Sequence, residues 1–164
     1  MWISSSRRSL RSSPDAEPAD LRERRLLALV VGEDPGLRRV IRTQLEQIRL
    51  PAMAVNGPPA VLSVVEAESG RSALSVLSAI APALVVMDLI LPELSGYELC
   101  ERLRANATLQ HVPILAMSAR AMPEDRAAAE EAGASAFLAK PFTPRELTKH
   151  VLPLLSVFSA NNDR

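Results

Sequence analysis

The stretch LVVMDLILPELSG, residues 84–96, decides how this chain folds. The run from Ala83 to Met87 is wholly apolar, as expected for a strand that is covered on both faces, and a carboxylate, Asp88, ends it abruptly. A segment with proline, serine and glycine follows at once, and Asp88 could serve only to stabilise that turn. A turn residue does not explain why an acid directly ends a buried strand, so we expect Asp88 to have a chemical role.

Apolar runs alternate with helical patterns along the rest of the chain. The predicted strands cover residues 26–31, 62–67, 83–87, 114–117 and 136–139. A helical pattern follows each strand, and the last one contains Pro153, which we expect to kink it or end it early. Strands that alternate with helices predict a parallel sheet with helices on both faces.

The domain limits follow from composition. Residues 1–24 are rich in serine, arginine and proline and are predicted to be disordered, residues 25–158 form one folded domain, and residues 159–164 form a C-terminal tail. Between the first helix and the second strand, residues 51–61 contain Asn56-Gly57 and Pro58-Pro59, which are turn signals. They predict an extended loop, with a short hairpin between residues 53–55 and 61–63 as an alternative.

The overall composition excludes several classes of protein. Lysine plus arginine equals aspartate plus glutamate, at 19 each, which gives no case for direct binding of nucleic acid. A single cysteine, Cys100, suits a reducing compartment. Neither a membrane-spanning run nor a secretory signal is found, so a cytoplasmic protein without membrane contact is expected.

Polar side chains stand at the carboxyl ends of four predicted strands: Glu33 and Asp34, then Asp88, Ser118 and Lys140. Because the carboxyl ends of parallel strands lie at one edge of the sheet, these side chains should converge there. Crowded carboxylates repel unless a cation joins them, and Mg²⁺ prefers a few carboxylates together with water and phosphate oxygens.

The choice of lysine at position 140 is itself informative. Of the 19 basic residues only Lys140 and Lys149 are lysines. A chain that otherwise uses arginine indicates a requirement for a compact ammonium group at position 140, since the two side chains are not interchangeable.

The segments VVGEDP, VVMDLILPELSGYEL, ILAMSA and FLAKPF resemble the receiver domain of bacterial response regulators, over about residues 26–158. The resemblance implies a doubly wound, flavodoxin-like α/β fold in three α/β/α layers, with five parallel strands in the order 2-1-3-4-5. It further implies a receiver similar to the single-domain chemotaxis regulators of two-component systems.

The resemblance also implies roles for individual residues. Asp88 corresponds to the phosphoacceptor, Ser118 to the switch hydroxyl, Lys140 to the lysine that pairs with the phosphoryl group, and Phe137 to the rotating aromatic residue. From the sequence, Phe137 could equally be a core residue. A cis peptide bond is expected before Pro141.

The metal ligands implied by the resemblance are Glu33, Asp88 and the backbone carbonyl of Ile90, with Asp34 as the second choice. The family usually has two adjacent acids after the first strand, and here Gly32 and Glu33 stand at those positions. One carboxylate is therefore missing. We expect Mg²⁺ to bind, with an affinity lowered by Gly32.

The resulting prediction is a signalling protein that takes a phosphoryl group from a histidine kinase or phosphotransfer protein onto Asp88. It is not expected to be an enzyme beyond slow self-dephosphorylation. Few residues follow Phe158, so the output is predicted to be binding to another protein through the surface of residues 136–158, as a monomer or weak dimer.

Two other functions compete with this prediction. A pseudo-receiver would bind proteins without phosphorylation, and Gly32 and the loop 51–61 motivate this alternative. An aspartyl-phosphate hydrolase would need a second aspartate two residues after Asp88, where Ile90 stands, so that activity is not expected.

Overall fold

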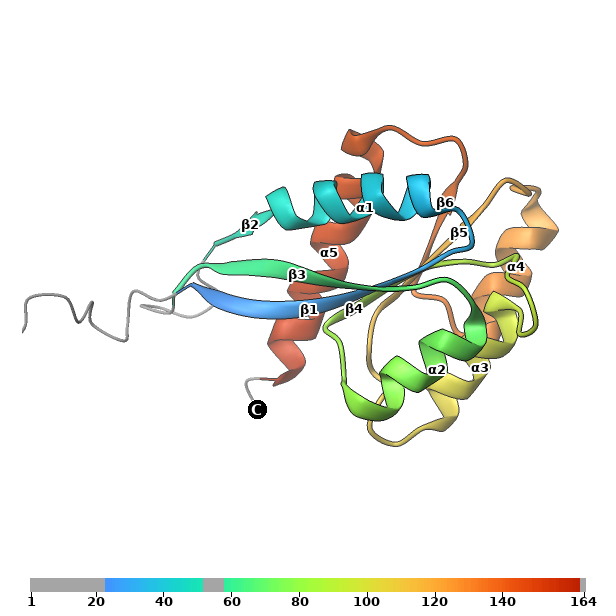
Figure 1. Ribbon diagram of the computed structural model, residues 1–164, viewed down its shortest axis with the longest axis horizontal. Helices are drawn as coiled ribbons and strands as arrows, with labels where there is room; N and C mark the ends of the chain where they lie inside the picture. Colours follow the sequence, from blue (N-terminus) through green and yellow to red (C-terminus); the bar gives the residue numbers. More distant parts are fainter. Residues whose placement is uncertain (1–22, 52–57, 163–164) are drawn as a thin grey trace, which may run out of the picture.

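The structure is a computed structural model that describes residues 23–51 and 58–162, with side chains up to residue 156. Helices cover both faces of one six-stranded sheet (Figure 1). The elements in chain order are β1 (Arg24–Val31), α1 (Pro35–Gln47), β2 (Arg49–Leu50), β3 (Ala60–Ala67), α2 (Gly70–Ala79), β4 (Leu84–Asp88), α3 (Gly96–Ala105), β5 (Ile114–Ser118), α4 (Pro123–Ala132), β6 (Ala136–Ala139) and α5 (Pro144–Asn162).

The strands lie in the order β2-β3-β1-β4-β5-β6. The five strands from β3 to β6 are parallel and have the predicted order, so the doubly wound arrangement is confirmed. The prediction of only five strands is wrong, because β2 pairs antiparallel with the start of β3, where Arg49 lies opposite Val61. The alternative hairpin partner, residues 53–55, lies outside the described residues.

The ends of the folded part also differ from the prediction. β1 begins at Arg24, within the predicted tail 1–24, because Arg24 pairs with Ala60 and its N–H donates a hydrogen bond to the carbonyl of Pro59 (2.9 Å). Residues 1–22 lie outside the described part. α5 runs through Pro153 to Asn162 rather than ending before residue 159.

The core forms on both faces of the sheet because neighbouring residues of a strand point to opposite sides. In β1, Ala28 and Val30 contact the cluster that includes α1 and α5, whereas Leu29 and Val31 contact the cluster that includes α2 and α3. A third cluster joins α4 to the sheet. These layers hold the carboxyl ends of the parallel strands at a single edge.

Arg104 ties α3 to the segments beside it. Its Nε donates a hydrogen bond to the carbonyl of Gly133 (2.8 Å), and its Nη1 donates to those of Gln110 (3.0 Å) and Val112 (2.7 Å). Gly133 ends α4 with a φ of 113°, and a Cβ at that position would lie 2.5 Å from Cγ of Arg104. One guanidinium therefore satisfies carbonyls at the end of α4 and before β5.

Replacing Arg104 by glutamine is expected to lower the free energy of unfolding by about 2–3 kcal/mol, because partly buried carbonyls lose a charged donor. Urea unfolding measures the change. Arg102→Gln is the matched control, since Arg102 is exposed on the same helix. Equal stability of the two variants would show that the Arg104 contacts contribute nothing.

Candidate functional site

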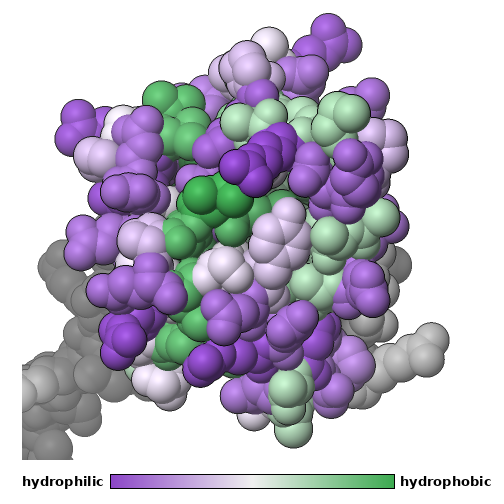
Figure 2. Space-filling view, turned by 90° about the vertical axis from the view of Figure 1, so that its right-hand side faces the viewer, coloured by the Kyte–Doolittle hydropathy of each residue, from purple (hydrophilic) through white to green (hydrophobic). Residues whose placement is uncertain are grey.

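Three of the predicted site residues meet at the carboxyl edge of the sheet. Asp88 is the last residue of β4, Ser118 is the last residue of β5, and Lys140 follows β6 directly. These three strands are neighbours, so the sheet itself brings the side chains together. Figure 2 faces this edge, where apolar surface lies among polar side chains.

Asp88 and Lys140 form an ion pair across 52 positions of sequence. Nζ of Lys140 donates a hydrogen bond to Oδ1 of Asp88 at 2.5 Å. Asp88 is 5% exposed, so water screens the pair poorly. The backbone N–H of Lys140 donates to the carbonyl of Ser118 (2.9 Å), and the peptide bond between Lys140 and Pro141 is cis, as expected.

Burial raises the pKa of the Asp88 carboxyl above its ordinary value of 3.8. The hydrogen bond and the positive charge of Lys140 oppose this rise, while the negative charge of Asp34 adds to it. The Asp88 carboxyl is therefore more basic than that of an exposed aspartate, although the Lys140 ammonium contacts one of its oxygens.

Asp88→Asn is expected to stabilise the protein at neutral pH by on the order of 1 kcal/mol, because it removes a buried charge and retains an oxygen that can accept from Lys140. The folded state holds the Asp88 proton more tightly than the unfolded chain, so the ionised carboxylate lowers the free energy of unfolding at pH values above the pKa of the folded state. This destabilisation shrinks as the pH falls through that pKa and is gone below 3.8, the ordinary pKa of the group. Urea unfolding from neutral to acid pH should therefore give two converging curves, and a variant less stable at neutral pH would contradict this.

Ser118 and Phe137 are both buried. The hydroxyl oxygen of Ser118, a residue 3% exposed, accepts a hydrogen bond from the backbone N–H of Arg120 (3.0 Å). Phe137 packs against Leu89 and other small and aliphatic residues, and the guanidinium carbon of Arg126 lies 4.7 Å from the centre of its ring. In this structure Phe137 is thus a core residue that a cation on α4 covers.

The acids predicted to bind a metal are less closely gathered. Glu33 is exposed, and Asp34 is the N-cap of α1, where its Oδ1 accepts from the N–H of Gly36 (2.8 Å) and of Leu37 (3.3 Å). The described residues hold no cluster of three or more histidine, cysteine, aspartate or glutamate side chains that could bind a metal. This donor set fits Mg²⁺ held by few carboxylates and by water, since Mg²⁺ keeps much of its hydration.

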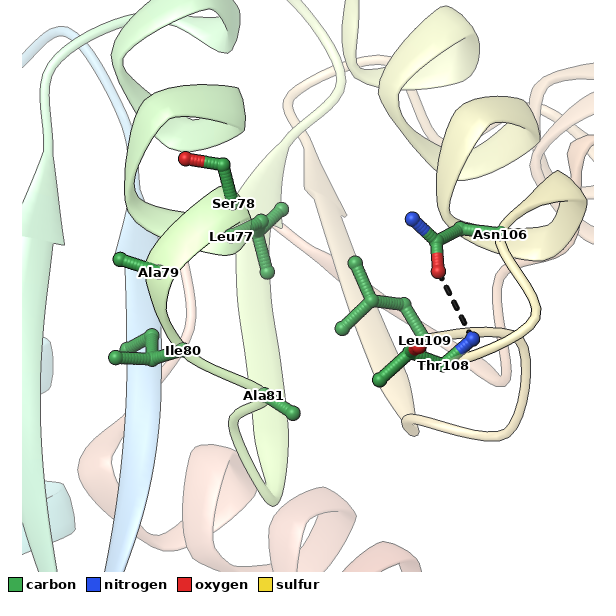
Figure 3. A pocket seen from close by; sticks show the side chains of 8 residues that line it. All are labelled: Leu77, Ser78, Ala79, Ile80, Ala81, Asn106, Thr108 and Leu109. Atoms are coloured by element: carbon green, nitrogen blue, oxygen red, sulfur yellow. Dashed lines mark hydrogen bonds between the residues drawn. The ribbon is translucent and has the colours of Figure 1, made fainter.

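A groove of about 390 Å³ opens beside the ion pair and is lined by Asp34, Leu37, Val40, Ala119, Lys140, Pro141 and Phe142. A second hollow, of about 260 Å³, lies between the end of α2 and the segment after α3 (Figure 3). Its lining contains polar side chains of Ser78, Asn106 and Thr108 but no ionisable group. Of these two hollows, only the first is lined by charged side chains, those of Asp34 and Lys140.

Comparison with known proteins agrees with this geometry. The sequence model of the response regulator receiver domain matches residues 28–152. The chain belongs to this family. Receiver domains of two-component systems act in signal transduction by phosphorylation, and the flavodoxin-like fold described above is theirs. In the described residues of this receiver domain, no helix is long and apolar enough to cross a bilayer.

Two curated relatives are named as response regulators. Rre1 of Synechocystis sp. is 33% identical over 148 residues, which cover 90% of this chain and 56% of the relative. MprA of Mycolicibacterium vanbaalenii is 36% identical over 127 residues, which cover 77% and 49%. This receiver domain thus spans about half the length of the curated relatives it matches first.

Solved receiver domains have the same fold. The signal receiver domain of a histidine kinase from Syntrophus aciditrophicus has a TM-score of 0.67 and 28% identity, with 80% of this chain and 91% of that chain covered. The receiver domain of a sensor histidine kinase from Pseudomonas aeruginosa, with a magnesium ion coordinated in its active site cleft, has a TM-score of 0.66 and 27% identity over 79% and 97% of the two chains.

Gly32 stands where the family resemblance predicts the first of two adjacent acids. A Cβ at that position would lie 2.7 Å from Oδ2 of Asp88, so the Asp88 carboxylate reaches into the space of the missing side chain. Arg38 borders the same space and lines a small pocket together with Gly32 and Asp88. Sequence reasoning did not identify Arg38, because helical periodicity says only that it lies one turn into α1.

Proposed function

We propose that this chain accepts a phosphoryl group on Asp88 from a phosphohistidine of a histidine kinase or phosphotransfer protein. The observation that carries the proposal is the ion pair between Asp88 and Lys140, which joins the ends of β4 and β6 in a member of the receiver family. A buried carboxylate with an adjacent ammonium has the charge arrangement that phosphoryl transfer requires.

In the proposed step an oxygen of Asp88 attacks the phosphorus atom and forms a P–O bond. The P–N bond to the donor histidine breaks, and its electron pair stays on the imidazole nitrogen, which can then take up a proton. Lys140 pairs with a phosphoryl oxygen as negative charge is transferred. Ser118 leaves its bond to the N–H of Arg120 and donates its hydroxyl to another phosphoryl oxygen.

Mg²⁺ would be held by Asp88, Glu33 and the backbone carbonyl of Ile90, with water completing the shell. Asp34 is the second choice, because its Oδ1 already accepts from two backbone N–H groups of α1. When bound, the ion supplies positive charge that offsets the charge of the phosphoryl group. The absence of a carboxylate at Gly32 supports a low affinity.

The phosphorylated chain would signal by a change of surface. A phosphoryl group adds a charge of about −1.5 to −2 at the carboxyl edge of the sheet. When Ser118 turns towards it, the adjacent strand β6 and helix α5 must repack, so we place the surface for the output protein at residues 136–158. The chain would act in the cytoplasm, as a monomer or weak dimer, with no enzymatic activity beyond slow loss of its own phosphoryl group.

The test is phosphorylation by acetyl phosphate in the presence of Mg²⁺, followed by mass spectrometry of the intact protein. The wild type is expected to gain one phosphoryl group, and Asp88→Asn is expected to gain none. Modification of the Asp88→Asn variant to the same extent would place the acceptor elsewhere and refute the proposal.

A pseudo-receiver is the second candidate, and Gly32 is the observation that favours it. If neither protein is modified although both are folded and Mg²⁺ is present, the chain is a protein-binding module that acts without phosphorylation. Phosphorylation of the wild type alone excludes this alternative.

A further inference from the structure

We propose that the Arg38 guanidinium is a second fixed cation of the Asp88 pocket, which binds phosphoryl oxygens and lowers the dependence of phosphorylation on Mg²⁺. The inference rests on the proposed function, because it assigns Arg38 a part in the same transfer. It concerns a residue to which no role in the site was assigned from sequence.

The position of Arg38 relative to Gly32 is the first support. Nη1 of Arg38 donates hydrogen bonds to the carbonyls of Gly32 (2.6 Å) and Glu33 (3.1 Å), which draws the guanidinium against the turn after β1. A Cβ at Gly32 would lie 2.7 Å from Oδ2 of Asp88 and 3.9 Å from Cγ of Arg38. The carboxylate and the arginine stem therefore flank the space from which a side chain is missing.

The second support is a donor with nothing to bind. Nε of Arg38 is buried and has no hydrogen-bond partner within the described part of the chain, where no other buried side-chain nitrogen or oxygen lacks one. Buried polar groups are nearly always paired, so an unpaired one requires an explanation such as a ligand that arrives later. Asp88 lines the same small, closed pocket as Arg38, and a phosphoryl group on Asp88 would bring acceptor oxygens next to it.

The chemistry of arginine fits this role. Its planar guanidinium offers several N–H donors in a fixed arrangement that matches phosphate oxygens. Lys140 binds Oδ1 of Asp88, whereas Arg38 lines the small pocket that Gly32 and Asp88 also line. Gly32 offers no carboxylate that could pair with Arg38, so the positive charge of Arg38 is not neutralised at position 32.

The first experiment measures anion binding without metal. Inorganic phosphate is titrated by calorimetry into Asp88→Asn protein in EDTA, with and without Arg38→Met. The added substitution is expected to weaken phosphate binding about tenfold, as for loss of a charged hydrogen bond. Arg39→Met is the matched control, because Arg39 is the exposed neighbour on α1 and should leave the affinity unchanged. Equal affinities with and without Arg38, or no phosphate binding at all, would overturn the inference.

The second experiment measures phosphorylation by acetyl phosphate over a range of Mg²⁺ concentrations. The wild type and Arg39→Met should retain a measurable rate in EDTA, whereas Arg38→Met should lose at least about tenfold in EDTA and much less at saturating Mg²⁺. If the ratio of the rate in EDTA to the rate at saturating Mg²⁺ is the same in all three proteins, a role for Arg38 is refuted. If no protein is phosphorylated at any Mg²⁺ concentration, the proposed function fails, while the calorimetry still decides on Arg38.

Gly32→Asp tests the same idea without altering Arg38, which also guards against a misfolded Arg38 variant. The new carboxylate would displace the end of the Asp88 side chain and pair with Arg38. This ion pair would neutralise the positive charge of Arg38. Phosphorylation in EDTA should fall about tenfold, and Mg²⁺ binding, followed by calorimetry, should tighten. A Gly32→Asp protein with unchanged rate in EDTA contradicts the inference.

Discussion

Lys140→Met is expected to slow phosphorylation of Asp88 by acetyl phosphate about 100-fold at saturating Mg²⁺. The ammonium of Lys140 donates a hydrogen bond directly to the acceptor carboxylate, at 2.5 Å. Removal of one fixed donor that stabilises developing charge typically lowers a rate by roughly 10²–10³-fold. Methionine retains the length and apolar character of the lysine stem. The change is measured as the initial rate of the mass increase of intact protein.

The pH dependence separates this electrostatic role from a merely structural one. Lys140 lowers the pKa of Asp88 against the effect of burial, so its loss should raise that pKa further. Only the ionised carboxylate attacks phosphorus, so the rise of rate with pH should move to higher pH in Lys140→Met. Lys149→Met is the control, since Lys149 is the other lysine of the chain and is exposed on α5. If Lys140→Met matches this control in both rate and pH profile, Lys140 has no part in the transfer.

The parallel sheet and the ion pair could be predicted from the sequence because both depend on patterns of apolar and polar residues that extend over whole strands and helices. Apolar runs that alternate with amphipathic helices define the parallel strands, and right-handed crossovers leave few orders for them. Once the strands are known, their carboxyl ends must share an edge. Asp88 and Lys140 were therefore expected to meet although 52 residues separate them, and the structure confirms that they do.

The parts that were missed depend on short pairings and on side-chain packing. β2 has two residues, too few for any periodic pattern, and it arises only because the chain passes next to β3. The position of Arg38 is set by carbonyls of the preceding turn, which no propensity predicts. The family resemblance predicts Glu33 as a metal ligand; its side chain is exposed, and this role stays a prediction.

The close approach at Gly96 is a further feature that only the coordinates reveal, and it predicts the largest loss of stability. Gly96 begins α3 and donates its N–H to the carbonyl of Leu89 (2.9 Å). A Cβ there would overlap the carbonyl oxygen of Asp88 and lie 2.6 Å from Cα of Leu89. Both are backbone atoms of the segment that carries the phosphoacceptor, so no side-chain rotation can relieve the contact.

Gly96→Ala is therefore expected to lower the free energy of unfolding by about 3 kcal/mol, and the melting temperature by roughly 6–12 °C, because the end of β4 must shift away from α3. Gly36→Ala is the matched control: it also lies in the first turn of a helix, but its Cβ would meet only Oδ1 of Asp34, at 3.1 Å, and it is exposed. That change should stay within about 1 kcal/mol.

Because the shift also moves Asp88, Gly96→Ala should be phosphorylated more slowly than Gly36→Ala at a temperature where both are folded. Thermal and urea unfolding measure the first effect, and an alanine at position 96 that costs no more than one at position 36 would mean that the backbone of β4 and α3 does not pack as closely as described.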